Sequence, residues 1–292
     1  MLISWKKRLK RIRHICEGRY LLVLFVLLQS GQVISLPDIP SFMDCEDVIF
    51  NAGFQNDSQA SQGSGGEYPG AYTRTVFSQG QNRNYYISIP PNYNPDNPLP
   101  LLFTWHGAGG AGTAPAYAKA HRTFWQVTGD MHNYIVVAQE STGQNGGWVP
   151  STDFLILSDI LQDMYDNYNI EKRRIYGHGF SAGGHVMHAL MLQDSEDYAG
   201  YVISAGVLDA YAGNMAPSNA IRTIPIYVSI GNSDTTGPNL NQLTHLDHIV
   251  FNTAGWVDNK NYWIDEFDGG HVIDENVRQK SWDKLCTISN IQ

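Results

Sequence analysis

The sequence predicts an α/β fold with a mostly parallel central sheet and helices on both of its faces. Short β-like runs alternate with helical patterns for about two hundred residues after Tyr68. Several of these runs are almost continuously apolar, as strands buried on both faces of a sheet should be. The chain has 292 residues, a length that a single α/β domain commonly reaches.

Seven runs are expected to form the strands of this sheet. In chain order they are 84–89, 101–105, 134–139, 173–177, 201–205, 224–230 and 262–267. Between the third and fourth runs, residues 153–168 carry apolar side chains at helical spacing, and residues 151–153 offer several N-caps. A second helical run, 185–193 (HVMHALMLQ), follows the fourth strand. Ligands in such sheets bind at the carboxyl ends of the strands, so we expect the site there.

Residues 1–30 have the pattern of an export signal. Seven Lys and Arg residues precede or flank the apolar run 20–28 (YLLVLFVLL), which is too short to span a bilayer. A cleaved signal predicts a secreted, extracellular or periplasmic protein, and an uncleaved anchor is the alternative. Residues 31–66 are interpreted as an N-terminal extension that ends in a flexible Ser/Gln/Gly-rich segment, 54–66, before the main domain at 67–292. Asn56 begins a glycosylation sequon.

The remaining chain is acidic. Residues 1–30 hold seven of the 19 basic residues and one of the 28 acidic residues, which leaves 12 basic and 27 acidic residues for 31–292. Such a balance disfavours nucleic acid and anionic membranes as partners. No stable membrane partner is expected once a signal is cleaved, and neutral substrates are compatible with this charge.

The segment Gly179-Phe180-Ser181-Ala182-Gly183 fits the pattern G-x-S-x-G. The pattern alone is weak, but here a strand run leads into it and a helical run leads out. A strand, a sharp turn and a helix are what a nucleophile elbow requires. We therefore expect Ser181 to be a nucleophile whose hydroxyl is exposed at the turn, with the start of a helix favouring negative charge beside it.

A glycine-rich loop, residues 106–110 (HGAGG), directly follows the run 101–105. In a hydrolase this is the place for an oxyanion donor. One backbone N–H is expected from Ala182 and the other from Gly107, Ala108 or Gly109; the sequence leaves open which of the three. His106 is expected to brace the loop rather than act as a base.

A serine hydroxyl requires a base, and the base requires an orienting acid. Asp234 ends a buried strand run, which suits the acid, with Asp209 as the alternative. His271, on a Gly-Gly loop after the final run, is the expected base and follows the acid in the chain order of this class. Asp247 and Asp258 are expected in a solvated helix or loop.

The other histidines near these motifs are interpreted as structural. His178, His185 and His188 flank the elbow and are expected to pack in the core or lie at the surface. His245 and His248 are spaced i, i+3, which is too weak a pattern to predict a metal site. We expect no metal and no cofactor.

Together, HGAGG at 106–110, YNIEKRRIYGHGFSAGG at 168–184, Asp234 and GGH at 269–271 resemble a known family. This family comprises extracellular α/β-hydrolases similar to polyhydroxybutyrate depolymerases and to feruloyl or acetyl xylan esterases. The resemblance covers about residues 70–290 and implies carboxylic ester hydrolysis through an acyl-enzyme, without a metal or cofactor. The family often has GLSAGG where this chain has GFSAGG, a departure that leaves the nucleophile intact.

The substrate stays open at the level of sequence. Polyesters, acylated plant polysaccharides and small esters are all compatible with the resemblance, so the expected partner is an ester, polymeric esters included. Trp148 follows a central strand and is expected either to line the substrate pocket or to pack against the sheet. The alternatives to an esterase are a serine peptidase on the same fold and a catalytically silent binding protein.

Cys45 and Cys286 are predicted to form a disulfide. They lie near the two ends of the mature chain, and an even pair in an exported protein favours a bridge; the alternative is two buried thiols. Closing a loop of about 240 residues would stabilise the fold by up to about 5 kcal/mol. The mature protein, denatured without reductant, should therefore titrate with no free thiol. Two thiols per chain in that titration would contradict the bridge.

Overall fold

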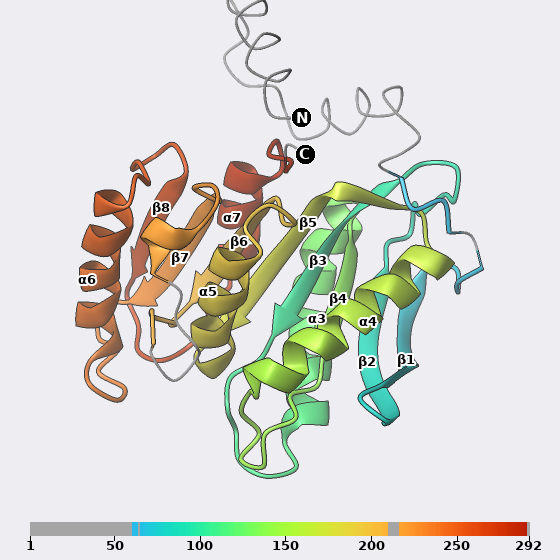
Figure 1. Cartoon of the computed structure of the whole chain (residues 1–292), viewed down its shortest axis with the longest axis horizontal. Helices are drawn as coiled ribbons and strands as arrows, with labels where there is room; N and C mark the ends of the chain where they lie inside the picture. The colour runs from blue at the N-terminus through green and yellow to red at the C-terminus, as the bar shows by residue number, and fades with distance from the viewer. Residues whose placement is uncertain (1–59, 64, 210–215, 291–292) are drawn as a thin grey trace, which may run out of the picture. The chain divides into compact units, whose positions relative to one another are not determined.

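The computed structural model describes residues 60–63, 65–209 and 216–290 (Figure 1). These residues belong to one compact unit, Asp44–Gln292. The second unit, Met1–Met43, lies outside the described residues, as do Cys45 and Asn56. The export signal, the sequon, the disulfide to the buried Cys286 and the boundaries of the predicted domains therefore stay predictions.

Eight strands form one sheet in the order β1-β2-β4-β3-β5-β6-β7-β8 (Figure 1). They are β1 (Gly70–Ser78), β2 (Gln81–Ile89), β3 (Leu99–Trp105), β4 (Ile135–Gln139), β5 (Ile170–Phe180), β6 (Gly200–Ser204), β7 (Ile226–Gly231) and β8 (Tyr262–Phe267). Strands β3 to β8 are parallel, whereas β1 and β2 pair antiparallel at one edge. The predicted α/β fold is confirmed. All seven predicted runs are strands, β2 to β8, and β1 was not expected.

Five α-helices of the described residues cover the sheet. They are α3 (Ala114–His132), α4 (Pro150–Asn167), α5 (Ala182–Gln193), α6 (Leu240–Thr253) and α7 (Val277–Leu285), with a short 3₁₀ helix at Pro217–Asn219. Helices α3 and α7 lie on one face of the sheet, and α4, α5 and α6 lie on the other (Figure 1). Within the described ranges, no helix combines the length and the apolar character needed to cross a bilayer.

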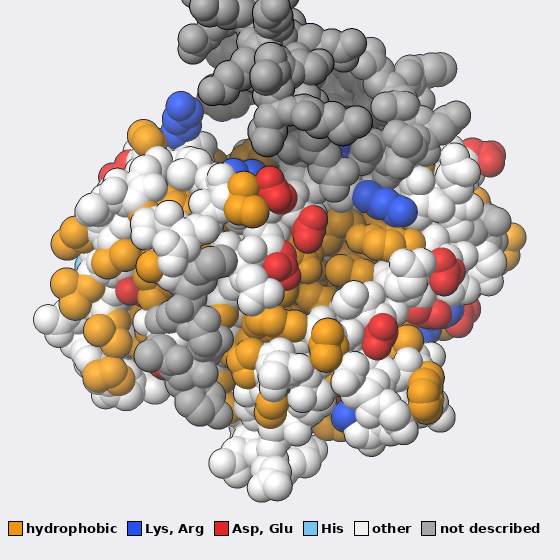
Figure 2. Space-filling model, viewed as in Figure 1, with side chains coloured by type: hydrophobic (Ala, Val, Ile, Leu, Met, Phe, Trp, Pro, Cys, Tyr) orange, Lys and Arg blue, Asp and Glu red, His pale blue; other side chains and the backbone are white. Residues whose placement is uncertain are grey.

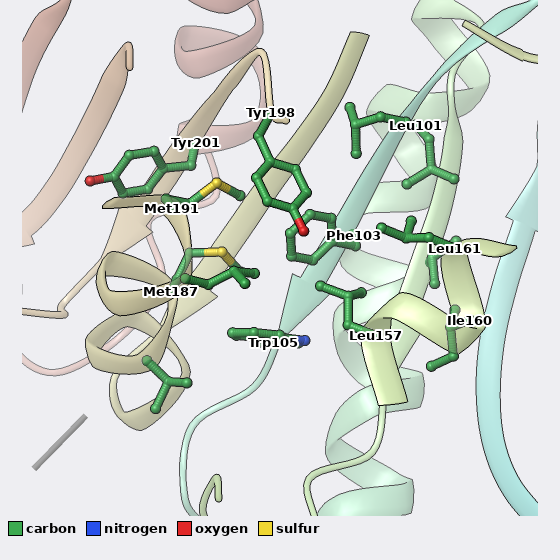
Figure 3. Packing of buried hydrophobic residues seen from close by; sticks show 14 of the residues in the cluster. Leu101, Phe103, Trp105, Leu157, Ile160, Leu161, Met187, Met191, Tyr198 and Tyr201 are labelled. Atoms are coloured by element: carbon green, nitrogen blue, oxygen red, sulfur yellow. The ribbon is translucent and has the colours of Figure 1, made fainter. Parts of the chain in front are cut away.

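Alternate residues of the strands build the two faces of the core. On β3, Leu101, Phe103 and Trp105 pack in the cluster beneath α4 and α5, whereas Leu102 packs on the α3 and α7 side. This is the two-residue period that a strand imposes on its side chains. Hydrophobic side chains gather between α4 and α5 in Figure 2, and Figure 3 shows Phe103 against Tyr198 there.

The start of α4 differs from the expectation of a cap at residues 151–153. The helix begins at Pro150, with Val149 at the N-cap position. Proline fits the first turn because its fixed φ is helical and it has no N–H to satisfy there. The carboxylate of Asp153 reaches back and accepts the N–H of Val149 at 2.6 Å. Asp153 thus acts from the first turn, as the acidic residue of a capping box does.

Segment 54–66 is predicted to be flexible; of it the structure describes residues 60–63 and 65–66, which pack against the main domain. Ala60 pairs with Glu171 of β5, the Ser61 N–H donates to Ile170 at 2.9 Å, and the Gly66 N–H donates to Asn167 at 2.9 Å. Gly63 is buried where a Cβ would lie 2.4 Å from the carbonyl oxygen of Tyr165. The small residues here permit close packing on the end of α4.

Phe103 should be a principal source of stability in this core. Its ring is 1% exposed in the middle of the sheet, whereas Phe77 on the edge strand β1 is 70% exposed. Phe103→Ala leaves a cavity and should lower the free energy of unfolding by about 3–5 kcal/mol. Phe77→Ala, the matched control, should change it by no more than about 0.5 kcal/mol. Urea denaturation of both variants checks this, and equal losses would contradict the packing described.

Candidate active site

Ser181 lies at a sharp turn between β5 and α5. Its backbone has φ 52° and ψ −121°, a conformation that costs energy for any residue with a side chain. Two hydrogen bonds hold it: the Ser181 N–H donates to the Ser204 carbonyl at 2.9 Å, and the Ser181 carbonyl accepts from the His185 N–H at 3.0 Å. The turn therefore has the strand-to-helix geometry expected of a nucleophile elbow.

Close packing at Gly183 sets the position of this turn. A Cβ on Gly183 would lie 2.5 Å from the carbonyl oxygen of Trp105 and 2.6 Å from that of His106. No side chain fits at such distances, so the first turn of α5 lies directly against the end of β3. The elbow and the 106–110 loop are thereby brought together.

His271 and Asp234 reach Ser181 from the ends of the neighbouring strands. His271 Nε2 lies 2.9 Å from Ser181 Oγ, and His271 Nδ1 lies 2.8 Å from Asp234 Oδ2. The Asp234 side chain is fully buried, whereas that of His271 is 25% exposed. These contacts join three predicted site residues, and they favour Asp234 over the alternative acid, Asp209.

The loops after β7 and β8 hold this acid and histidine together. The second carboxylate oxygen of Asp234 accepts the Thr236 N–H at 3.1 Å, so both oxygens have a partner. The Ser233 N–H donates to the Gly269 carbonyl at 2.9 Å. A Cβ on Gly231 would lie 2.4 Å from the carbonyl oxygens of Gly269 and Gly270. Glycine at the end of β7 thus allows the loop that carries His271 to approach closely.

The 106–110 loop passes beside the serine. Gly107 is buried, and a Cβ there would lie 3.1 Å from Ser181 Cβ. Within the described ranges, the N–H groups of Gly107, Ala108, Gly109 and Ala182 donate to no protein acceptor, whereas the Gly110 N–H donates to Asn145 at 3.0 Å. The amides that the sequence predicts as oxyanion donors therefore have no hydrogen-bond acceptor among the described residues.

This geometry can be compared with known proteins. The chain is similar to feruloyl and acetylxylan esterases. It is 29% identical over 158 residues to a bifunctional acetylxylan esterase/xylanase of Neocallimastix patriciarum, covering 53% of this chain and 22% of that protein. It is 28% identical over 188 residues to feruloyl esterase D of Neurospora crassa, covering 59% and 60%. The chain thus spans less than two thirds of either relative. No protein-family model matches it.

Solved structures share the fold. A CE1 ferulic acid esterase from Anaeromyces mucronatus, in complex with ferulic acid, has a TM-score of 0.59 at 15% identity, covering 80% of this chain and 95% of that one. A protein assigned as a dipeptidyl aminopeptidase IV from Bacteroides ovatus also has a TM-score of 0.59, at 16% identity, covering 74% and 35%. The α/β-hydrolase fold and the resemblance expected from the sequence are confirmed.

Trp148 does not line a substrate pocket, which corrects one of the two interpretations of the sequence. Its side chain is 2% exposed and its indole N–H donates to the His106 carbonyl at 2.7 Å. Its ring packs against Trp105, with centroids 4.8 Å apart. The alternative, packing against the sheet, holds. The exposed aromatic residue beside the 106–110 loop is Tyr117, which lies against Gly109 and which the sequence did not single out.

The remaining histidines have structural partners. Burial lowers the pKa of His106 and of His178, which favours the neutral imidazole at both. His185 lies 3.0 Å from the Val207 backbone, and His188 lies 3.1 Å from the Tyr201 hydroxyl. These contacts fit the packing roles expected of the histidines around the elbow.

The i, i+3 pair on α6 divides between two carboxylates. His245 pairs with Glu266 at 2.9 Å and His248 pairs with Asp258 at 2.6 Å. In the part of the chain that the structure describes, no cluster of three or more His, Cys, Asp or Glu side chains could hold a metal ion.

Asp247 is only partly solvated, less than expected, and this predicts a pH dependence. Burial raises its pKa to about 7, although it accepts the Leu208 N–H at 2.7 Å. The folded chain then binds this proton more tightly than the unfolded chain, so the contribution of Asp247 to stability falls as pH rises from about 4 to 7. Asp247→Asn keeps an acceptor for Leu208 and should raise the free energy of unfolding at pH 8 by roughly 1 kcal/mol, since partial exposure screens the effect.

Denaturation at pH 4 and pH 8 checks this prediction. The gain from Asp247→Asn should disappear at pH 4, because the side chain at position 247 is neutral there in the folded wild type as well as in the variant. The control is Asp258→Asn: its hydrogen bond to His248 lowers the pKa of Asp258, so this variant should bring no gain at pH 8. Equal gains for Asp247→Asn at the two pH values would contradict the shifted pKa.

Proposed function

We propose that the protein is a serine esterase that hydrolyses carboxylic esters through Ser181, His271 and Asp234. One observation carries the proposal: Ser181, at a strained turn, lies within hydrogen-bond distance of His271, which in turn contacts a buried carboxylate. Backbone strain at a polar residue is characteristic of functional sites. The similarity to feruloyl and acetylxylan esterases supports an ester as the substrate.

The contacts suggest a role for each group. Asp234 accepts from His271 Nδ1, which leaves Nε2 unprotonated and able to take the proton of the Ser181 hydroxyl. The Ser181 oxygen attacks the ester carbonyl, and the Ala182 N–H with one amide of the 106–110 loop stabilises the oxyanion. His271 returns the proton to the leaving alcohol. Water, activated by the same histidine, then attacks the acyl-enzyme and frees the acid.

Acyl esters of plant polysaccharides are the substrates we propose. The relatives are named for feruloyl and acetylxylan esters, and one solved neighbour binds ferulic acid. Tyr117, 42% exposed beside Gly109, offers an aromatic surface next to the 106–110 loop. Export fits a polymeric substrate, since a polysaccharide cannot enter a cell, and the basic and apolar pattern of residues 1–30 supports export.

Ser181→Ala should abolish esterase activity. Loss of the nucleophile or of its base typically lowers kcat by about 10⁴-fold or more, so Ser181→Ala and His271→Ala should both fall to background on p-nitrophenyl acetate and methyl ferulate. Asp234→Asn should lose roughly 10³–10⁴-fold. Ser158→Ala, at an exposed position on α4, is the matched control and should keep full activity.

A fluorophosphonate probe and a peptide anilide panel complete this test. The wild type should be labelled and Ser181→Ala should not, since the probe reacts with an activated serine. Labelling of Ser181→Ala would contradict the assignment of the nucleophile. Faster hydrolysis of peptide anilides than of esters would favour a peptidase, the assignment given to the Bacteroides ovatus neighbour.

A further inference from the structure

The oxyanion donors can act only if the peptide planes of the 106–110 loop have fixed orientations. Donors stabilise a transition state because they are already aligned before charge develops, and misalignment by a fraction of an ångström weakens them. The glycines of this loop have no side chains whose packing could supply this alignment. Hydrogen bonds from buried side chains must therefore hold the peptide planes of Gly107 and Ala108.

Trp148 holds the first of these planes. Its indole N–H donates to the His106 carbonyl at 2.7 Å, and that carbonyl also faces the position of a Gly183 Cβ at 2.6 Å. In a trans peptide the carbonyl of one residue and the N–H of the next point in opposite directions. Because the His106 oxygen accepts the indole N–H of Trp148, the N–H of Gly107 is directed away from that indole.

His106 holds the second plane. Its Nδ1 lies 2.8 Å from the Gly107 carbonyl, to which a neutral imidazole donates. The other ring nitrogen, Nε2, accepts the Ser141 N–H at 3.4 Å. The Gly107 oxygen is thus fixed on the imidazole side, and the N–H of Ala108 points the opposite way.

The Trp148 ring is closely packed. Its centroid lies 4.8 Å from that of Trp105 and 5.0 Å from that of His106. At 2% exposure it offers no surface to a substrate. A buried indole whose only N–H donates to a loop carbonyl acts on the loop and not on the ligand.

We propose that Trp148 is a positioning residue, which fixes the oxyanion-binding amides of the 106–110 loop through its hydrogen bond to the His106 carbonyl. This inference rests on the proposed esterase function. It assigns Trp148 to stabilisation of the tetrahedral intermediate and not to binding of the ester.

Trp148→Phe removes the donor and keeps an aromatic ring. The expected result is a fall in kcat of roughly tenfold to hundredfold on p-nitrophenyl acetate, less than the loss of a whole oxyanion donor, with KM changed by less than about twofold. An alkylboronic acid forms a tetrahedral adduct with the serine and places an oxygen at the oxyanion position. Its inhibition constant should rise by about the same factor as kcat falls, because both report the same alignment.

Trp256→Phe is the matched control. Trp256 is also 2% exposed, and its indole N–H also donates to a backbone carbonyl at 2.7 Å, that of Ile224. The two variants lose the same kind of buried hydrogen bond and should lower the melting temperature by similar amounts. Only Trp148→Phe should lower kcat and weaken the boronic acid, whereas Trp256→Phe should stay within about twofold of wild type.

The outcomes separate this inference from the function on which it rests. If Ser181→Ala is inactive but Trp148→Phe keeps the kcat of Trp256→Phe, the positioning role is wrong and the esterase stands. A rise in KM with unchanged kcat in Trp148→Phe would also overturn it, since that result belongs to a substrate contact. If Ser181→Ala keeps its activity, the proposed function itself fails.

Discussion

The approach of α5 to the end of β3 is the constraint on which the rest of the site depends. Only a residue without a Cβ can stand at position 183, because two carbonyl oxygens of the β3 end lie within 2.6 Å of where a Cβ would be. This approach forces the chain to reverse between β5 and α5 within a single residue. Ser181 takes the strained conformation that results, and the 106–110 loop becomes its neighbour.

The acid and the base lie on loops that follow β7 and β8, away from the strands β3 and β5 that lead to the 106–110 loop and to Ser181. Asp234 and His271 follow β7 and β8, and Ser181 lies 90 positions before the histidine in the chain. Parallel strands end at the same edge of the sheet, so residues far apart in sequence meet there. Backbone contacts between the loops after β7 and β8, from Ser233 to Gly269, join the acid and the base into one unit. The acid and the base thus have contacts of their own, besides those that His271 makes with the Phe180 ring and the Ser181 hydroxyl.

The strands were predictable because burial on both faces leaves an almost unbroken apolar run. β1 was not, because as an edge strand it alternates exposed and half-buried residues, including Arg74 and Thr75. Helix α3 is not evident from the sequence either. Its buried positions include Ala118, His121 and Thr128, which give little apolar periodicity. Of the positions described on α6, Leu240, Thr244 and Phe251 are buried, again a weak stripe.

Part of the site, too, was predictable from the sequence and part was not. The order of serine, acid and histidine, with each candidate at a strand end, led to the three residues that the structure brings together. Trp148 shows the limit. Its place after a glycine turn shows that it is near the site but not which side of the 106–110 loop it lies on, and that side decides between a pocket wall and a brace. Segment 54–66 has the same limit as Trp148. Its composition is common to flexible segments and to closely packed turns, so the sequence does not decide between them.

The surroundings of the histidines explain why, in the part of the chain that the structure describes, His271 is the one that suits the role of base. Burial lowers the pKa of His106, His121, His178 and His188, so gaining a proton would place an uncompensated charge in the core. Among the described residues, three histidines contact a carboxylate, and two of these pairs are exposed at α6, where solvent screens the attraction. The third pair joins a partly exposed His271 to the fully buried Asp234. The carboxylate of Asp234, which solvent does not screen, compensates a positive charge formed on the His271 imidazole. The Ser181 hydroxyl lies within hydrogen-bond distance of Nε2, the nitrogen that would take its proton.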